Sequence, residues 1–159
     1  MNCILNLAVK CITSRKNKKI IEDLEKLDDK THILSLNGLT TVAKCTKCYD
    51  ADTIHLVIPY NNNYYRWTCR LEEIDSAEIK SKNKAEQEHA IRSRDYLKSL
   101  ILNKIVTIKC GKFDKYGRLL VFVSINDIDI NKHLVEKGYA YKYTGGYKMN
   151  FDMWQRMII

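Results

Sequence analysis

Residues 53–74 read TIHLVIPYNNNYYRWTCRLEEI, and this stretch decides the fold class. From residue 54 to residue 58, isoleucine and leucine fall on alternate positions, which gives an extended chain one apolar face. The three asparagines at 61–63 are side chains that turns prefer. Apolar and aromatic residues resume at 64–74. The stretch therefore predicts two strands joined by a turn.

Three further segments predict strands on either side of this stretch. Upstream, residues 41–49 alternate loosely between polar and apolar side chains. Downstream, residues 105–110 and 119–125 form two apolar runs, and the second is apolar on both faces, as expected of a central strand. Five strands are therefore expected.

Two helices are expected among these strands. Residues 84–102 carry apolar residues on one helical face, which ends with Leu97 and Ile101. A second helix begins with Asp129 as a candidate N-cap and ends at Gly138, where a C-terminal glycine belongs. The order strand, strand, strand, helix, two strands, helix predicts a mainly β fold with flanking helices, namely a five-stranded Greek-key OB-fold barrel.

The two ends of the chain differ from this central region. Residues 1–38 are treated as an N-terminal extension, and residues 39–159 as the barrel domain. Apolar residues at helical spacing in the extension predict a short amphipathic helix ending near residues 28–29; they are Ile20, Ile21, Leu24 and Leu27. We favour packing of this helix on the domain, and the alternative is a partner-binding arm. The C-terminal residues expected to dock on the core are Trp154, Met157 and Ile158.

Charge and hydropathy limit the classes of partner. The chain of 159 residues has a formal net charge of +8, and cationic side chains that meet phosphates release condensed counterions. This charge favours a polyanion such as nucleic acid, and an anionic membrane surface is the alternative. No apolar run is long enough to span a bilayer. We expect a monomer with no membrane partner.

The N-terminal residues and the cysteines indicate in which cellular compartment the protein is expected. The basic cluster at residues 15–19 follows a fairly apolar start, whereas a secretory peptide places its charge first. We therefore expect no signal peptide, an intracellular location and reduced thiols. Among the 6 cysteines, Cys69 and Cys110 fit small buried apolar side chains. Cys45 and Cys48 form a lone CxxC without a second ligand pair for zinc, so strand packing is the favoured interpretation.

Two acidic segments carry candidate chemistry. In residues 50–53, DADT, the two carboxylates share a face if the chain is extended, and converging carboxylates suit a hard divalent cation. The alternative is a plain turn, where Asp is common. In residues 70–78, RLEEIDSAE, a strand delivers Arg70 and Asp75, and Glu78 follows in a loop. The alternative there is a helix cap, because Asp75 and Glu78 have a capping-box spacing.

Two later segments complete the pattern. Residues 114–118, DKYGR, predict a tight turn at Gly117 that presents Tyr116 and Arg118 at the mouth of a sheet. An arginine placed there can meet a phosphate if a second site faces it. The last segment, residues 131–140, fits helix and turn packing and carries no chemistry of its own.

Taken in order, these segments resemble the staphylococcal nuclease family, from about Thr41 to Tyr143. The shared elements are the Asp-x-Asp-Thr step, the Arg-Leu-x-x-Ile-Asp-Ser-x-Glu strand and loop, the Asp-Lys-Tyr-Gly-Arg turn, and the Asn…Leu-Val…Gly-x-Ala helix. Each element alone is common, whereas the ordered set at family-like spacing is specific. The resemblance implies a calcium-dependent endonuclease that hydrolyses phosphodiester bonds of DNA or RNA, prefers single strands and leaves 3′-phosphate ends.

The resemblance also implies a role for each matched position. The implied Ca²⁺ ligands are Asp52, Asp75 and the backbone carbonyl of Ser76, with Asp50 as a supporting carboxylate. The implied catalytic residues are Glu78, as general base, and Arg70 and Arg118, which grip the scissile phosphate. The implied nucleotide contacts are Lys115, Tyr116 and Tyr143.

Two other interpretations compete with an active enzyme. The first alternative is a catalytically weak or inactive nucleic-acid-binding module on the same fold, and the second is a structural OB domain. An inactive module is expected to lack several of five residues that are all present here: Asp52, Arg70, Asp75, Glu78 and Arg118. The sequence therefore favours the enzyme.

Overall fold

The structure is a computed structural model that describes residues 15–158, and residue contacts divide the chain into Met1–Leu34 and Ser35–Ile159. In the first unit, helix α2 (Arg15–Leu24) is followed by a turn in which Leu27 N–H donates to the Leu24 carbonyl. Its apolar residues Ile20, Ile21, Leu24 and Leu27 are exposed. The amphipathic helix is therefore present, but it ends at Leu24 and not near residues 28–29 as predicted. Its packing on the domain stays a prediction.

The second unit is built around the predicted hairpin. Strand β2 (Thr53–Tyr60) pairs with β3 (Asn63–Leu71), in a register that runs from Thr53 opposite Arg70 to Tyr60 opposite Asn63. The turn consists of Asn61 and Asn62 alone, with φ values of 50° and 59°. Two consecutive positive φ angles suit the twist of a two-residue hairpin, and Asn accepts them more readily than most residues.

The strands close into a barrel. Their order is β3, β2, β1 (Thr40–Cys48), β5 (Ile105–Phe113) and β6 (Leu119–Ile125), and a parallel pairing of β3 with β6 joins the two ends. The barrel interior holds the fully buried apolar side chains Ile54, Leu56, Ile58, Leu71, Ile108, Leu119 and Val121. This five-stranded barrel with flanking helices confirms the predicted OB-fold class.

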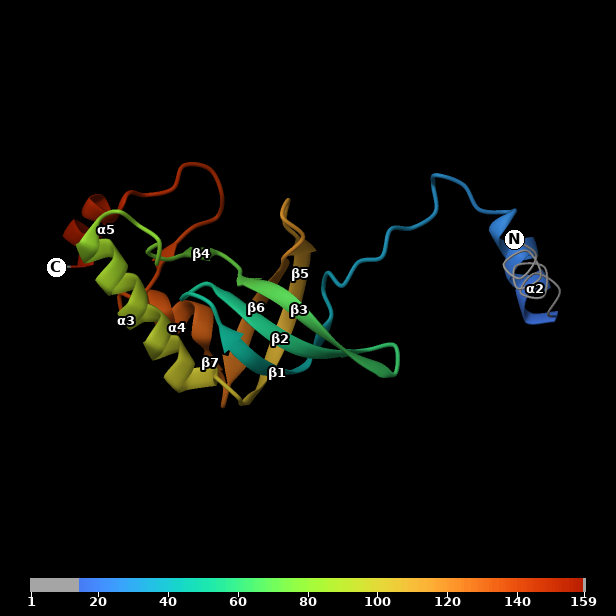
Figure 1. The fold of residues 1–159 in the computed structure, drawn as a ribbon, viewed down its shortest axis with the longest axis horizontal. Helices are drawn as coiled ribbons and strands as arrows, with labels where there is room; N and C mark the ends of the chain where they lie inside the picture. The colour runs from blue at the N-terminus through green and yellow to red at the C-terminus, as the bar shows by residue number, and fades with distance from the viewer. Residues whose placement is uncertain (1–14, 159) are drawn as a thin grey trace, which may run out of the picture. The chain divides into compact units, whose positions relative to one another are not determined.

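Two helices pack on the barrel, and a third lies beyond them (Figure 1). Helix α3 (Lys84–Ile101) is capped by Asn83 and buries Leu97 and Ile101 against the core. Helix α4 (Ile130–Glu136) starts at the predicted N-cap, since Asp129 accepts a hydrogen bond from the Lys132 N–H. Gly138 follows its end with φ 69°. Helix α5 (Phe151–Ile158) lies beyond these, near the C-terminus.

Three short elements were not predicted. Strand β7 (Ile128–Asp129) leads into α4, and β4 (Ile74–Asp75) pairs with β8 (Tyr141–Lys142) in a separate two-stranded sheet. The third strand was predicted to continue to residue 74, and that is wrong. It ends at Leu71, because Glu73 takes a positive φ of 62° and bends the chain before β4.

The C-terminal helix docks through Trp154, with Phe151 packed against the same cluster. Trp154 is buried in a small cluster with Tyr141, whereas Met157 is exposed. The Ile158 side chain lies outside the described part of the structure.

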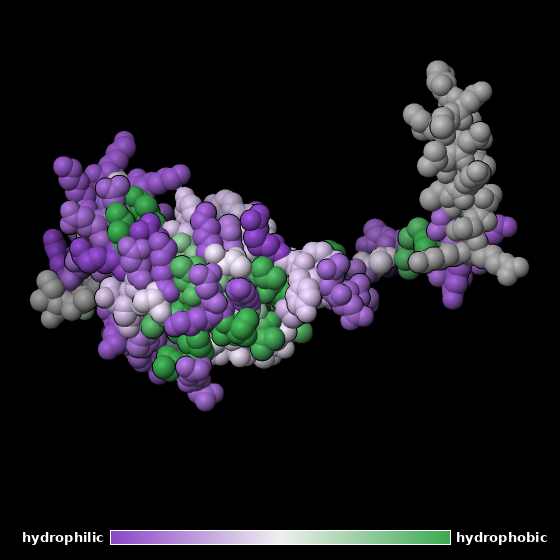
Figure 2. All heavy atoms as spheres, turned by 60° about the horizontal axis from the view of Figure 1, so that its bottom comes forward, coloured by the Kyte–Doolittle hydropathy of each residue, from purple (hydrophilic) through white to green (hydrophobic). Residues whose placement is uncertain are grey.

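On the barrel, apolar side chains gather on one side of a surface that is otherwise mainly hydrophilic (Figure 2). None of the described helices is long and apolar enough to cross a membrane.

Candidate active site

A cavity of about 670 Å³ opens at one end of the barrel and collects the sequence-predicted site residues. Those that line it are Asp50, Asp52, Arg70, Ser76, Glu78, Lys115, Tyr116, Arg118 and Tyr143. Asp75 lies directly behind them, in contact with Arg70. The structure thus brings together residues from four separate segments of the chain.

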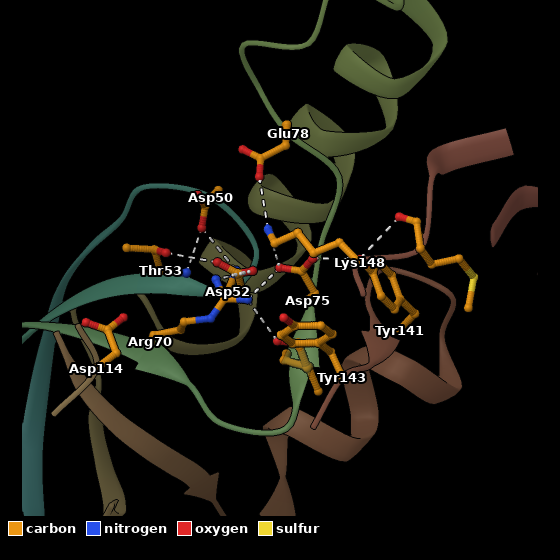
Figure 3. A network of polar contacts seen from close by, with 12 residues as sticks. Asp50, Asp52, Thr53, Arg70, Asp75, Glu78, Asp114, Tyr141, Tyr143 and Lys148 are labelled. Atoms are coloured by element: carbon orange, nitrogen blue, oxygen red, sulfur yellow. Dashed lines mark hydrogen bonds and ion pairs between the residues drawn. The ribbon is translucent and has the colours of Figure 1, made fainter. Parts of the chain in front are cut away.

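The first acidic segment is a turn. Asp50 Oδ1 accepts hydrogen bonds from the N–H groups of Asp52, at 3.1 Å, and Thr53, at 2.6 Å. The premise of an extended chain was therefore wrong, and the turn brings Asp50 and Asp52 to the same cavity instead (Figure 3). The Asp52 carboxylate also accepts a hydrogen bond from the Thr53 hydroxyl at 2.9 Å.

Arg70 joins the two buried carboxylates. Its NH1 lies 2.8 Å from Asp52 Oδ2, and its NH2 lies 2.5 Å from Asp75 Oδ1. The hairpin register explains the first contact, because Thr53, the neighbour of Asp52, is the cross-strand partner of Arg70. Asp75 follows in β4, so the helix-cap interpretation of this segment is wrong. Charge-assisted bonds of this kind are among the stronger ones in proteins.

The two carboxylates differ in electrostatic environment. Burial, with the nearby Asp50 carboxylate, raises the pKa of Asp52 to about 8 against the opposing effect of Arg70. Burial also acts to raise the pKa of Asp75, but hydrogen bonds from Tyr141 and Arg70 outweigh it, and the pKa lies below its ordinary value. Acidic charge around Asp52 is thus only partly compensated by the protein.

This donor set fits a hard divalent cation. Carboxylate oxygens are the ligands that Ca²⁺ prefers, and Asp52 and Asp75 share one guanidinium group at the cavity wall. Among residues 15–158, no group of three or more His, Cys, Asp or Glu side chains lies in metal-holding geometry. In this structure Arg70 pairs with both Asp52 and Asp75, and Lys148 pairs with Asp75.

A second turn positions Arg118. Asp114 Oδ1 accepts hydrogen bonds from the N–H groups of Tyr116 and Arg118, both at 2.9 Å, and its Oδ2 lies 2.7 Å from Arg118 Nε. Gly117 takes the positive φ, 78°, that this turn requires. Leu119, the next residue after Arg118, pairs with Cys69 in the strand pairing that closes the barrel. Arg118 therefore reaches the same cavity as Arg70.

The rim of the cavity is aromatic and basic. Tyr116 is 71% exposed, with Lys115 Nζ 5.1 Å and Arg118 Cζ 5.4 Å from its ring centroid. Tyr143 donates its hydroxyl hydrogen to the Gly146 carbonyl at 3.0 Å. An exposed ring between cations suits the stacking of an unpaired base.

Two residues of the site were missed by the sequence analysis. Tyr141 donates a hydrogen bond to Asp75 Oδ2 at 2.6 Å, and Lys148 Nζ lies 3.1 Å from Asp75 Oδ1 and 3.4 Å from Glu78 Oε1 (Figure 3). Both come from the C-terminal part, where no motif drew attention to them. Asp114 and Thr53 were also left without a role, although both lie inside the quoted motifs.

Asn131 fixes the frame of the site. Its Nδ2 donates to the Glu72 carbonyl at 2.9 Å and to the Val121 carbonyl at 3.1 Å, and its Oδ1 accepts from the Val123 N–H at 3.0 Å. These bonds tie the bend after β3 to strand β6. The residue thus positions the backbone between Arg70 and Asp75.

The CxxC pair lies in the barrel wall. The Sγ atoms of Cys45 and Cys48 are 3.8 Å apart, and both residues are buried. They belong to the same core cluster as Cys69 and Cys110, which are also buried as predicted. The pair thus packs within strand β1, in line with the favoured interpretation.

Comparison with known proteins decides the family. The model of the family described as staphylococcal nuclease homologues matches residues 68–158, which is more than half of the chain. The chain belongs to the staphylococcal nuclease family. The matched range of this staphylococcal nuclease homologue includes Arg70, Asp75, Glu78 and Arg118, and it begins after the Asp50–Asp52 turn.

Two curated relatives are uncharacterized proteins. One, from Methanocaldococcus jannaschii, is 27% identical over 130 residues, which cover 67% of this chain and 61% of the relative. The other, from Bacillus anthracis, is 34% identical over 109 residues, which cover 66% of this chain and 49% of the relative. The chain thus spans about half to three fifths of the length of these relatives.

Proposed function

We propose that this staphylococcal nuclease homologue is a calcium-dependent endonuclease that hydrolyses phosphodiester bonds of DNA or RNA and leaves 3′-phosphate ends. The observation that carries the proposal is the cavity itself, where two buried carboxylates joined by Arg70 face Glu78 and Arg118. The net charge of +8 supports a polyanionic substrate.

The cationic residues account for phosphate binding. A phosphodiester gains negative charge on its equatorial oxygens during attack, so fixed cations beside it lower the barrier. The guanidinium groups of Arg70 and Arg118 would supply this positive charge, and their planar shape suits phosphate oxygens. Both side chains are largely buried and held by carboxylates, which fixes their direction.

Glu78 accounts for proton transfer. Its side chain is 64% exposed and lines the cavity, where it can take a proton from an incoming water. Asp52, Asp75 and the Ser76 carbonyl would hold Ca²⁺, with Asp50 in support, and the ion would supply positive charge and orient the water. Lys115, Tyr116 and Tyr143 would hold the neighbouring nucleotide by charge and stacking, which favours a single strand.

The second candidate function is nucleic-acid binding without cleavage. It is favoured by one observation, namely that Arg70 and Lys148 already neutralise Asp75 without a metal ion. A protein of that class would bind single strands in a salt-dependent manner and would show no response to Ca²⁺.

The test is cleavage of fluorescent single-stranded DNA and RNA in Ca²⁺ or in excess chelator, with Glu78→Gln beside the wild type. We expect calcium-dependent cutting that falls in Glu78→Gln on the order of 10² to 10⁴, the usual contribution of a general base. Glu136→Gln, at an exposed position of α4, is the matched control and is expected to cut normally. A wild type that binds but does not cut in Ca²⁺ would establish the binding module instead.

A further inference from the structure

Lys148 reaches into the site from the loop between β8 and α5. Its ammonium group lies between two acids, 3.1 Å from Asp75 Oδ1 and 3.4 Å from Glu78 Oε1 (Figure 3). The two acids and the lysine are far apart in the sequence, so the fold alone brings this cation to the cavity. No role for Lys148 follows from the motifs that define the site.

Both oxygen atoms of Asp75 have partners in this arrangement. Oδ1 is shared by Arg70 and Lys148, and Oδ2 accepts the Tyr141 hydroxyl. A divalent cation that takes Oδ1 as a ligand must therefore compete with Arg70 and Lys148.

Lys148 is the partner that is held most weakly. The Arg70 side chain is 13% exposed and contacts both carboxylates, and Tyr141 is buried against Trp154. The Lys148 side chain is 52% exposed, and its loop contains Gly145 and Gly146, both with positive φ. The lysine end of this ion pair is open to solvent, so Lys148 is easier to displace than Arg70 or Tyr141.

We propose that Lys148 competes with the divalent cation for Asp75 and, once displaced, binds a phosphate group of the nucleic acid. This inference rests on the proposed function. The lysine thus becomes a third cation of the substrate site, and it becomes available only when the metal ion is bound. Release from Asp75 makes N–H donors of the ammonium group available for phosphate oxygens.

Calcium binding without substrate tests the first part of the proposal, the competition between Lys148 and the cation. Titration calorimetry of Ca²⁺ is expected to show a roughly two- to fivefold tighter affinity in Lys148→Gln than in the wild type, the range given by an exposed ion pair. Lys148→Arg keeps the charge and is expected to match the wild type. Lys132→Gln, which removes an exposed ion-paired lysine on α4, is the control and is expected to leave the affinity unchanged.

Binding of a labelled single-stranded oligonucleotide tests the second part of the proposal, the phosphate contact of Lys148. The measurement uses an Arg118→Ala background that slows cleavage. In Ca²⁺, Lys148→Gln is expected to weaken binding and to lower the slope of log affinity against log salt by about 0.7, the value for one phosphate contact on a single strand. In chelator the same variant is expected to have little effect, because Lys148 is then held by Asp75 and Glu78.

The outcomes distinguish a failure of this inference from a failure of the proposed function. A wild type that binds Ca²⁺ and cuts, with Lys148→Gln no tighter for Ca²⁺, overturns this inference alone. The inference also fails if Lys148→Gln weakens oligonucleotide binding equally with and without Ca²⁺. A wild type that neither binds Ca²⁺ nor cuts overturns the proposed function and this inference with it.

Discussion

The Tyr141 hydroxyl donates a 2.6 Å hydrogen bond to Asp75 Oδ2, and the two residues are also direct partners across the β4–β8 ladder. This small sheet therefore sets both the backbone position and the side-chain direction of a buried carboxylate. The same ladder connects the C-terminal region to the site, because Tyr141 packs on Trp154 at a ring distance of 5.3 Å. The order of the C-terminal helix is thus coupled to the acidic centre.

Tyr141→Phe is expected to destabilise the protein by about 1.5 to 3 kcal/mol, the usual contribution of a hydrogen bond to a charged group. The substitution keeps the ring and its packing on Trp154, so the change reports the loss of the hydroxyl, which bonds to Asp75 and lies 3.4 Å from the Met149 carbonyl oxygen. Urea unfolding followed by fluorescence measures it. Among the described residues, the Tyr143 hydroxyl bonds to the Gly146 carbonyl in an exposed loop. Tyr143→Phe is therefore expected to lower the free energy of unfolding by less than Tyr141→Phe does. Equal losses in the two variants would contradict the role given to Tyr141.

The barrel could be predicted because its determinants are local. The alternation at residues 54–58 and the Asn turn specify the hairpin, and Asp129 and Gly138 mark the ends of α4. The site could be predicted only as far as short motifs reach. Each motif delivers its own side chains, and the barrel topology brings them to one cavity.

The parts that could not be predicted depend on contacts between distant residues. Strands β4 and β8 have two residues each, too few for any periodicity to show. Lys148 and Asp75 are 73 residues apart, and a lysine in a glycine-containing loop looks like any solvated side chain. Asp50 and Asp52 converge through a turn that a strand pattern does not describe.

Asp114→Asn is expected to lower kcat/KM by about tenfold to 10²-fold, the range for misplacing a catalytic group by about 1 Å. The carboxylate holds the turn and the Arg118 Nε at 2.7 Å, and an amide replaces only part of these contacts. The measurement is the initial rate on a fluorescent oligonucleotide at saturating Ca²⁺.

A double-mutant cycle shows whether Asp114 acts through Arg118. In an Arg118→Ala background, Asp114→Asn is expected to lower kcat/KM little further, because the guanidinium group that Asp114 positions is already absent. Additive losses would mean that Asp114 has an independent role in the cavity.

Ca²⁺ is expected to raise the thermal midpoint of the wild type. A ligand that binds only the folded state stabilises it by about 2.7 kcal/mol at 100 times its dissociation constant. In Asp52→Asn, which removes a buried carboxyl group from the proposed ligand set, this shift is expected to shrink or disappear. Asp127→Asn, at an exposed turn position with positive φ, is the control and is expected to keep the shift. The measurement is a melting curve with and without Ca²⁺, and an unchanged shift in Asp52→Asn would remove Asp52 from the ligand set.

His89 is expected to make the docking of α5 sensitive to acid. Its ring lies 4.7 Å from Trp154 and 5.6 Å from Phe151, and its Nε2 has no hydrogen-bond partner among the described residues. Burial, with a smaller effect of Arg92, lowers the pKa of His89 below its ordinary value. Because the unfolded chain takes up the proton first, stability is unaffected at high pH and falls as the pH drops through the ordinary histidine pKa.

His89→Phe keeps an aromatic ring in the cluster and removes the titrating group. Between about pH 7.5 and about pH 5.5, the urea midpoint of the wild type is therefore expected to fall further than that of His89→Phe, because only the wild type has a buried ring to protonate. His32→Gln changes an exposed histidine outside the barrel unit and is expected to follow the wild type. Parallel pH curves for the wild type and His89→Phe would show that other groups cause the acid sensitivity, and a steeper curve in His89→Phe would contradict the assigned sign.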